Sequence, residues 1–299
     1  YFDGTRTDIA LTPSIEGAAI HACVIVSESR TLPALVTAHR EIFAGLPVLL
    51  APGGLAGALR VSAVDESLLV AETTGFPASG FTEGDTFFLR GVKHGMPFAA
   101  VDHQLAPALL AEFRRYLPTL VASDLRTTSL SNTNHIIHPP ITLMNAARID
   151  SATPFTLYRE GVSSSLEHLL RAVDEERRSV CRAVGADDRS GRDWLYEFYH
   201  RDGMEGATFV DCLTSYPGFA DVHGPTTLDY RYLADDVPHG VACWAEIGGR
   251  IGIPTPSIDH LLAVLATIAP NVDLRADADG LELFLEHVQQ SQQDPVPHH

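Results

Sequence analysis

Leu46-Pro-Val-Leu-Leu-Ala-Pro-Gly-Gly-Leu-Ala-Gly57 is a short apolar run that ends in a glycine-rich turn, a pattern typical of a buried strand. Another apolar run at 22–26 and a segment with helical spacing at 32–43 precede it. The order strand, helix, strand, turn predicts a parallel, doubly wound sheet. We also expect strands at 67–71, 87–92 and 119–122, and a helix at 106–116.

The second half of the chain has a different texture, because its apolar residues fall into helical spacing from about Leu130 onward. A long helix is expected to begin at a Ser164-x-x-Glu167 capping box and to end at Gly185. Further helices are predicted around 194–198 and at 256–268, the latter with Thr255 as N-cap. The sequence therefore predicts an α/β domain at 1–127 and an all-α domain at 128–299.

Composition excludes several classes of protein. At 299 residues the chain suits two domains, and its net charge of −17 makes the average surface repel nucleic acid. The four cysteines form no Cys-x-x-Cys pair, which favours reduced thiols and a cytoplasmic location. Apolar runs near the length of a membrane span and leader-like segments are both missing, so we expect no membrane partner.

Two distant segments carry the candidate chemistry. Arg231-Tyr-Leu-Ala-Asp-Asp236-Val-Pro-His-Gly240 supplies a guanidinium and a carboxylate, and His138-Pro139-Pro140 supplies an imidazole. Pro139 suits the first turn of a helix, which would place His138 at the N-terminal rim, where the helix dipole favours the neutral ring. Asp236 is the candidate partner that opposes this effect, and Arg231 the candidate fork for a substrate carboxylate.

Each of these residues also has a purely structural interpretation. His138 alone fits a structural histidine, and Arg231 with Asp235 or Asp236 fits a surface ion pair. His135 and His138 form a His-x-x-His pair, but the third ligand and the glutamate of known zinc motifs are missing, so we expect no metal site. The glycine-rich turn at 53–57 lacks the P-loop lysine and the Rossmann spacing.

Several motifs, in order along the chain, resemble the opine dehydrogenase family, which comprises the octopine, nopaline and related N-(carboxyalkyl)amino acid dehydrogenases. They are Pro52-Gly-Gly-Leu-Ala-Gly57-Ala-Leu, Val70-Ala-Glu72-Thr, Asn134-x-x-x-His138-Pro-x-x-x-Leu-Met-Asn145, Tyr158-Arg-Glu-Gly161, Pro225-Thr-Thr-Leu-Asp-x-Arg231-Tyr-Leu-x-x-Asp236-Val-Pro-x-Gly240 and Gly252-Ile-Pro-Thr-Pro256. The resemblance implies a partial Rossmann-type parallel-sheet domain followed by a helical domain, with the active site in the cleft between them.

The resemblance also implies a reaction. Enzymes of this family condense the amine of an amino acid with a 2-oxo acid such as pyruvate, and NAD(P)H reduces the resulting imine. By resemblance His138 is the general acid/base, Asp236 orients and charges it, and Arg231 anchors a substrate carboxylate. Asn134 either contacts substrate or shapes its helix, as does Asn145. Pro52, Gly53 and Gly54 would lie near the nicotinamide, and the C-terminal helices offer surface for a homodimer.

One feature of the family is missing from the sequence. Family members begin with a strand, a Gly-x-Gly-x-x-Gly turn and a helix, whereas Tyr1 starts after that unit. Three explanations stay open: a fragment of a longer protein, a missing part supplied by another chain, or loss of hydride transfer. We therefore expect NAD(P)H as cofactor if the segment exists and no cofactor otherwise. Without that segment the protein is a cofactor-independent relative that performs non-redox condensation or imine chemistry or binds ligands.

Overall fold

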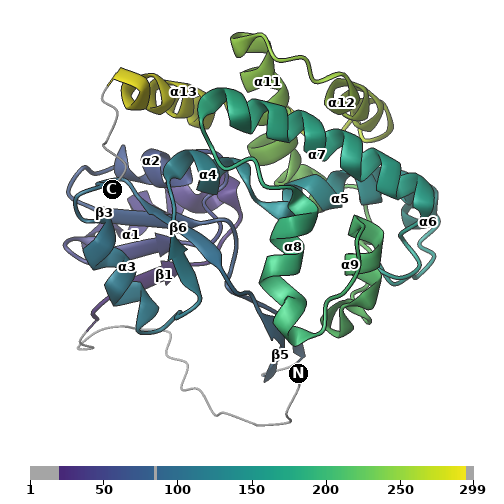
Figure 1. Cartoon of the computed structure of the whole chain (residues 1–299), viewed down its shortest axis with the longest axis horizontal. Coiled ribbons are helices and arrows are strands. Elements are labelled where there is room, and N and C mark those ends of the chain that lie inside the picture. The colour runs from purple at the N-terminus through teal and green to yellow at the C-terminus, as the bar shows by residue number, and fades with distance from the viewer. Residues whose placement is uncertain (1–19, 84–85, 294–299) are drawn as a thin grey trace.

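The computed structural model describes residues 20–83 and 86–293, so the predicted start after the nucleotide motif lies outside the described residues. A twisted sheet with its helices forms one half of the molecule and a group of helices forms the other (Figure 1). This arrangement confirms the predicted fold class of an α/β part followed by an all-α part. The predicted boundary near residue 127 falls inside helix α4 (Leu125–Leu130) and stays a prediction.

Five strands form the main sheet in the order β1-β2-β3-β6-β7. Their bounds are β1 Cys23–Ile25, β2 Pro47–Leu50, β3 Leu69–Thr73, β6 Met96–Ala100 and β7 Leu120–Ala122. Strands β1, β2 and β3 are parallel, with Val48 opposite both Cys23 and Val70. Strand β6 is antiparallel to β3 and parallel to β7. The predicted parallel pairing therefore holds for β1, β2 and β3 and for β6 with β7, and the antiparallel pairing of β3 with β6 makes the sheet mixed.

A two-stranded hairpin explains this reversal. Strand β4 (Ala78–Glu83) pairs antiparallel with β5 (Thr86–Val92), the segment predicted as a strand of the main sheet. The chain leaves β3 into this hairpin and re-enters the sheet beside β3, so no helical crossover keeps the next strand parallel. The hairpin extends from the sheet toward helix α8 (Gly191–Tyr199) (Figure 1). The hydroxyl of Tyr216, which follows Ser215, donates to the Arg90 carbonyl of β5.

The sheet is covered by short helices. Helix α1 (Leu32–Phe43) has the predicted bounds and buries Leu32, Val36 and Phe43 in the core that also contains Val48 and Val70. Helix α2 (Gly57–Ser62) follows the glycine-rich turn. Helix α3 (Ala106–Arg114) packs on β6 and β7, and its Phe113 ring lies 6.0 Å from that of Phe98.

The long helix α7 (Ser164–Val184) organises the helical half and contacts four other helices of that half. Its N-cap is Ser163 instead of the predicted Ser164, because the Ser163 hydroxyl accepts from the Leu166 amide. The Glu167 carboxylate accepts from the Val210 amide and so does not close a capping box. Gly185 ends the helix at φ +72°, as predicted. The four helices are α5 Thr133–Met144, α9 Phe209–Ser215, α11 Ala242–Ile251 and α12 Pro256–Ile268. The same half also contains the short helices α6 Ala146–Asp150 and α10 Arg231–Ala234.

The last helix, α13 (Ala278–Gln293), returns to the sheet half and packs on α2. Just before it, Asp277 pairs with Arg60 of α2 at 2.8 Å. Within the described part of the chain, none of the helices combines the length and the apolar character needed to cross a bilayer.

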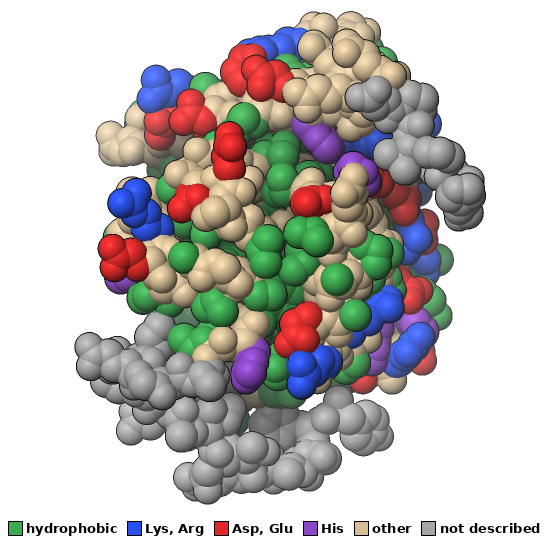
Figure 2. Space-filling view, turned by 90° about the vertical axis from the view of Figure 1, so that its left-hand side faces the viewer, with side chains coloured by type: hydrophobic (Ala, Val, Ile, Leu, Met, Phe, Trp, Pro, Cys, Tyr) green, Lys and Arg blue, Asp and Glu red, His purple; other side chains and the backbone are tan. Residues whose placement is uncertain are grey.

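Strand β1 lies at the edge of the described sheet. Its flank is apolar, since Val24 and Val26 are 41% and 56% exposed, although exposed edges usually carry charge. Figure 2, which views the molecule from the sheet side, shows apolar side chains gathered at the centre of this face and charged side chains around them.

Candidate active site

Helix α5 carries His138 in its interior. The helix begins after Asn132, whose side-chain oxygen accepts from the Asn134 amide at 3.0 Å, and both Pro139 and Pro140 lie inside it. The prediction that Pro139 occupies the first turn was therefore wrong. Burial of the surrounding isoleucines outweighs the hydrogen bonds that two prolines remove. The helix dipole no longer explains a neutral His138, and desolvation takes its place.

His138 and Asp236 form a buried pair, as predicted. Nδ1 of His138 lies 2.6 Å from Oδ2 of Asp236, and the two residues are only 2% and 3% exposed. Burial lowers the pKa of His138 below its ordinary value, and the Asp236 carboxylate opposes that shift. Although burial favours the neutral acid, the charge and hydrogen bond of His138 hold the pKa of Asp236 below its usual range.

Two tyrosines complete the surroundings of His138, and the sequence had assigned a role to neither. The Tyr158 hydroxyl lies 2.9 Å from Nε2 of His138, and the ring of Tyr232 stacks on the imidazole at 3.9 Å. Burial keeps the pKa of Tyr158 well above its ordinary value, so the hydroxyl donates and Nε2 accepts. Nδ1–H then donates to Asp236. Both tyrosines stand in motifs that resemble the family, and this was the signal in the sequence that could have pointed to them.

Asp236 lies where helix α10 gives way to the π-helical turn η4 (Val237–Val241). Pro238 supplies no amide hydrogen there, and the Val241 amide reaches back to the Asp236 carbonyl. A Cβ on Gly240 would overlap the ring of His135, whose Nε2 lies 3.7 Å from Oδ1 of Asp236, the oxygen that does not contact His138. Gly240 therefore lets η4 approach α5 closely enough to join Asp236 to His138.

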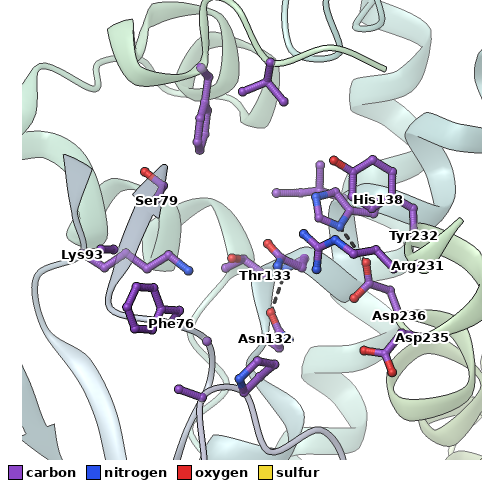
Figure 3. A pocket seen from close by; sticks show the side chains of 18 of the residues that line it. Phe76, Ser79, Lys93, Asn132, Thr133, His138, Arg231, Tyr232, Asp235 and Asp236 are labelled. Atoms are coloured by element: carbon purple, nitrogen blue, oxygen red, sulfur yellow. Dashed lines mark hydrogen bonds and ion pairs between the residues drawn. The ribbon is translucent and has the colours of Figure 1, made fainter. Parts of the chain in front are cut away.

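A cavity of about 540 Å³ opens in front of this pair. Segments that follow the carboxyl ends of β1, β2 and β3 line one wall, and α5, Tyr158 and α10 line another. Figure 3 shows the Arg231 and Lys93 side chains extending into the space from different sides. Asn134 also lines the cavity, so the predicted His138, Asp236, Arg231 and Asn134 are brought together.

Arg231 is exposed to the cavity instead of being tied up on the surface. Among the residues that the structure describes, it has no carboxylate within ion-pair distance, although Asp235 and Asp236 follow it closely in the chain. Its guanidinium lies 5.4 Å from the centre of the Tyr232 ring. The surface ion pair considered from the sequence is therefore not formed, and the guanidinium is free to bind an anion.

The Glu72 side chain packs against the glycine-rich turn. The buried Glu72 carboxylate accepts from the Ala58 amide at 2.7 Å and from the Thr128 hydroxyl at 2.6 Å. A Cβ on Gly53 would lie 2.5 Å from Oε2 of Glu72, and one on Gly54 (φ +72°) 2.6 Å from Oγ of Ser29. Of the three residues predicted to contact cofactor, only Pro52 lines the cavity. Cofactor binding by Gly53 and Gly54 stays a prediction.

The cavity lies at the carboxyl ends of the strands, where doubly wound sheets bind their ligands. The described residues contain no Gly-x-Gly-x-x-Gly turn for the pyrophosphate. Within the same residues no group of three His, Cys, Asp or Glu side chains is arranged to hold a metal ion. His135 instead contacts Asn132 at 3.1 Å, and burial lowers its pKa to about 4.

Comparison with known proteins identifies the family. The family model described as NAD/NADP octopine/nopaline dehydrogenase, alpha-helical domain, matches residues 121–269. An opine dehydrogenase of Arthrobacter sp. is 31% identical over 246 residues, which cover 80% of this chain and 67% of that enzyme. This chain belongs to the opine dehydrogenase family.

Other members of the opine dehydrogenase family agree with this placement. Vitopine synthase of Allorhizobium ampelinum is 28% identical over 197 residues, or 64% of this chain and 53% of that protein. The solved structure of octopine dehydrogenase with NADH and L-arginine has a TM-score of 0.64 at 15% identity, covering 92% of this chain and 79% of that one. Yersinopine dehydrogenase bound to NADP⁺ has a TM-score of 0.62 at 12% identity, covering 92% and 81%. These structures support the fold.

Proposed function

We propose that the protein is an NAD(P)H-dependent opine dehydrogenase that joins the amine of an amino acid to a 2-oxo acid through a reduced imine. The observation that carries the proposal is the buried His138–Asp236 pair, which faces a cavity at the carboxyl ends of β1, β2 and β3. Family membership and the cofactors named for related structures, NADH and NADP⁺, support it.

His138 acts as the proton carrier. Loss of water from the carbinolamine needs an acid at the leaving oxygen, and a ring with Nδ1–H fixed by Asp236 presents Nε2 for that transfer. Tyr158 holds Nε2 at 2.9 Å and yields this position to substrate. The Asp236 carboxylate stabilises the imidazolium form of His138, whose positive charge burial otherwise disfavours.

Arg231 binds the carboxylate of the 2-oxo acid. Its guanidinium projects into the cavity without a carboxylate partner among the described residues, and a planar fork suits a carboxylate. Asn134, one turn before His138 on the same helix, lines the same space and offers an amide for substrate. Pro52 lines the same cavity and would hold the nicotinamide of a bound NAD(P)H, which would supply the hydride for the imine carbon.

The test is an assay of the purified protein with NADH and with NADPH, pyruvate and a panel of amino acids. We expect consumption of one reduced cofactor that requires both organic substrates, together with a secondary amine identified by mass spectrometry. Formation of an imine or adduct without cofactor consumption would instead establish a cofactor-independent relative. Activity with pyruvate alone would show a simple 2-oxo acid reductase.

A further inference from the structure

Lys93 is the single lysine of this sequence. The chain has 21 basic residues, and the other 20 are arginines. Lys93 follows strand β5 and extends into the active-site cavity (Figure 3). A chain that uses arginine everywhere else has placed its one compact, flexible ammonium group in the cavity that holds His138.

The ammonium group of Lys93 is not neutralised. Among the described residues no carboxylate lies within ion-pair distance of it, whereas Arg90, also at the cavity, pairs with Asp221 at 3.0 Å. Nζ of Lys93 lies 5.7 Å from the centre of the Phe198 ring. A Cβ on Gly75 would lie 3.0 Å from the same Nζ. Burial and the charge of Arg231 lower the pKa of Lys93 to about 8. Near pH 7 the group is still mostly charged.

Two cations that share one cavity raise the free energy of the empty site, and a bound anion removes that cost. The cavity lining also contains Glu28, Asp235 and Asp236, but these carboxylates pair with Arg30, His239 and His138. The ammonium of Lys93 and the guanidinium of Arg231 therefore stay available to attract an organic acid to a protein whose net charge is −17. In the imine proposed above, one carboxylate is attached on each side of the C=N bond. A dicarboxylate of this kind needs one cation on each side, as Lys93 and Arg231 provide.

We propose that Lys93 binds the carboxylate of the amine substrate, so that the site selects an α-amino acid over the corresponding simple amine. This inference rests on the proposed function and narrows its substrate class. We assign the carboxylate of the 2-oxo acid to Arg231, because Arg231 lies beside Tyr232 and the Tyr232 ring stacks on His138. His138 is not the partner of Lys93, since its two ring nitrogens contact Asp236 and Tyr158.

The first test compares an L-amino acid with its decarboxylated amine in Lys93→Met, Lys93→Arg and Arg275→Met. Arg275 is a control cation outside the cavity lining, with a side chain that is 88% exposed. We expect Lys93→Met to reduce the preference in kcat/KM for the amino acid at least about tenfold, the effect of losing a charged hydrogen bond. Lys93→Arg should keep most of the preference, and Arg275→Met all of it.

Three results would overturn the inference. Lys93→Met could lower kcat/KM equally for amino acid and amine, which indicates a general structural or proton-transfer role. It could raise KM for pyruvate alone, which assigns Lys93 to the 2-oxo acid. It could raise KM for NADH or NADPH alone, which assigns it to a cofactor phosphate.

A second test needs no turnover. An amine-acylating reagent labels Lys93, and peptide mass spectrometry measures its rate at this site separately from the amino terminus. An N-(1-carboxyethyl)amino acid should slow the labelling, and an analogue without the amino acid carboxylate should not. Equal rates with both compounds would contradict the inference. If no amino acid is turned over, the proposed function fails, and this protection still decides whether Lys93 binds the carboxylate.

Discussion

Nδ1 of His138 lies 2.6 Å from Oδ2 of Asp236, although 98 positions separate the two residues in the chain. Helix α5 supplies the histidine, and the junction of α10 and η4 supplies the carboxylate. Burial and the charges of Arg231 and Lys93 favour neutral imidazole, and the Asp236 carboxylate opposes them by favouring imidazolium. In the proposed function this ring is the proton carrier for the loss of water.

Replacing Asp236 by Asn should reduce kcat of the reductive reaction by about 10²- to 10⁴-fold, the range for general acid–base groups. Asp236 opposes the lowering of the His138 pKa by burial, so its loss lowers that pKa further. The reductive reaction needs protonated His138, and its rate falls as pH rises through that pKa. The descending limb of the kcat/KM profile should therefore move to lower pH. An unchanged limb would show that His138 is not the titrating group.

Replacing Tyr158 by Phe removes the hydroxyl that contacts Nε2 of His138 but keeps a ring in the same place. We expect a modest loss of kcat, on the order of tenfold, because one neutral hydrogen bond that orients the imidazole is lost. The midpoint of thermal unfolding serves as the control and should change little. A loss as large as that of Asp236→Asn would make Tyr158 itself the proton donor.

Arg231→Lys should raise KM for pyruvate at least about tenfold, because a single ammonium does not reproduce the bidentate fork. KM for the amino acid should stay near the wild-type value, since Lys93 holds that substrate. Steady-state kinetics with each substrate varied in turn distinguish the two. A larger effect on the amino acid than on pyruvate would exchange the assignments of Arg231 and Lys93.

Glu72 should make stability depend on pH. Burial raises the pKa of Glu72 from 4.5 to about 7, so between these values the folded state holds a proton that the unfolded state has lost. The Glu72 contribution to stability therefore falls as pH rises from 4.5 to 7. Glu72→Gln removes this slope, because the glutamine side chain does not titrate. Its amide oxygen can still accept from the Ala58 amide. Urea unfolding at pH 5 and pH 8 measures the free energy of unfolding of both proteins. An equal change between the two pH values in wild type and variant would contradict this role of Glu72.

Gly240→Ala should disturb the His138–Asp236 pair without changing either residue. A Cβ at this position overlaps the His135 ring, so η4 must move away from α5 and carry Asp236 with it. We expect loss of stability of about 1–3 kcal/mol, as for overpacking, and a loss of kcat. Gly249→Ala is the matched control, since its Cβ meets nothing within 4 Å. Full activity in Gly240→Ala would refute the proposed role of this close approach.

Elements with chemical signals at their ends were predictable from the sequence. Helices α1 and α12 match their predicted bounds, α1 from its helical spacing and α12 because Thr255 and Pro256 mark its start. Strands β4 and β6 were missed: β4 is polar with an internal glycine, and β6 is a five-residue apolar run that contains Pro97. The prolines of α5 misled the prediction because tertiary packing overrides the local rule.

The site was predictable only where several residues formed a motif. His138, Asp236, Arg231 and Asn134 were identified and lie at one cavity. Lys93 was missed, since a single lysine has no spacing to interpret and reaches the cavity only through the position of the β4–β5 hairpin. Gly53 and Gly54 were placed near the cofactor, but a motif does not reveal that Glu72 and Ser29 contact their far side.

Transfer of deuterium from NADH or NADPH labelled at the hydride position tests the central claim most directly. The purified protein and its His138→Asn variant are incubated with the labelled cofactor, pyruvate and an amino acid, and the product is weighed by mass spectrometry. We expect an N-(1-carboxyethyl)amino acid that carries one deuterium and forms at least about 10²-fold more slowly in the variant. A product without deuterium, or equal rates in both proteins, would contradict it.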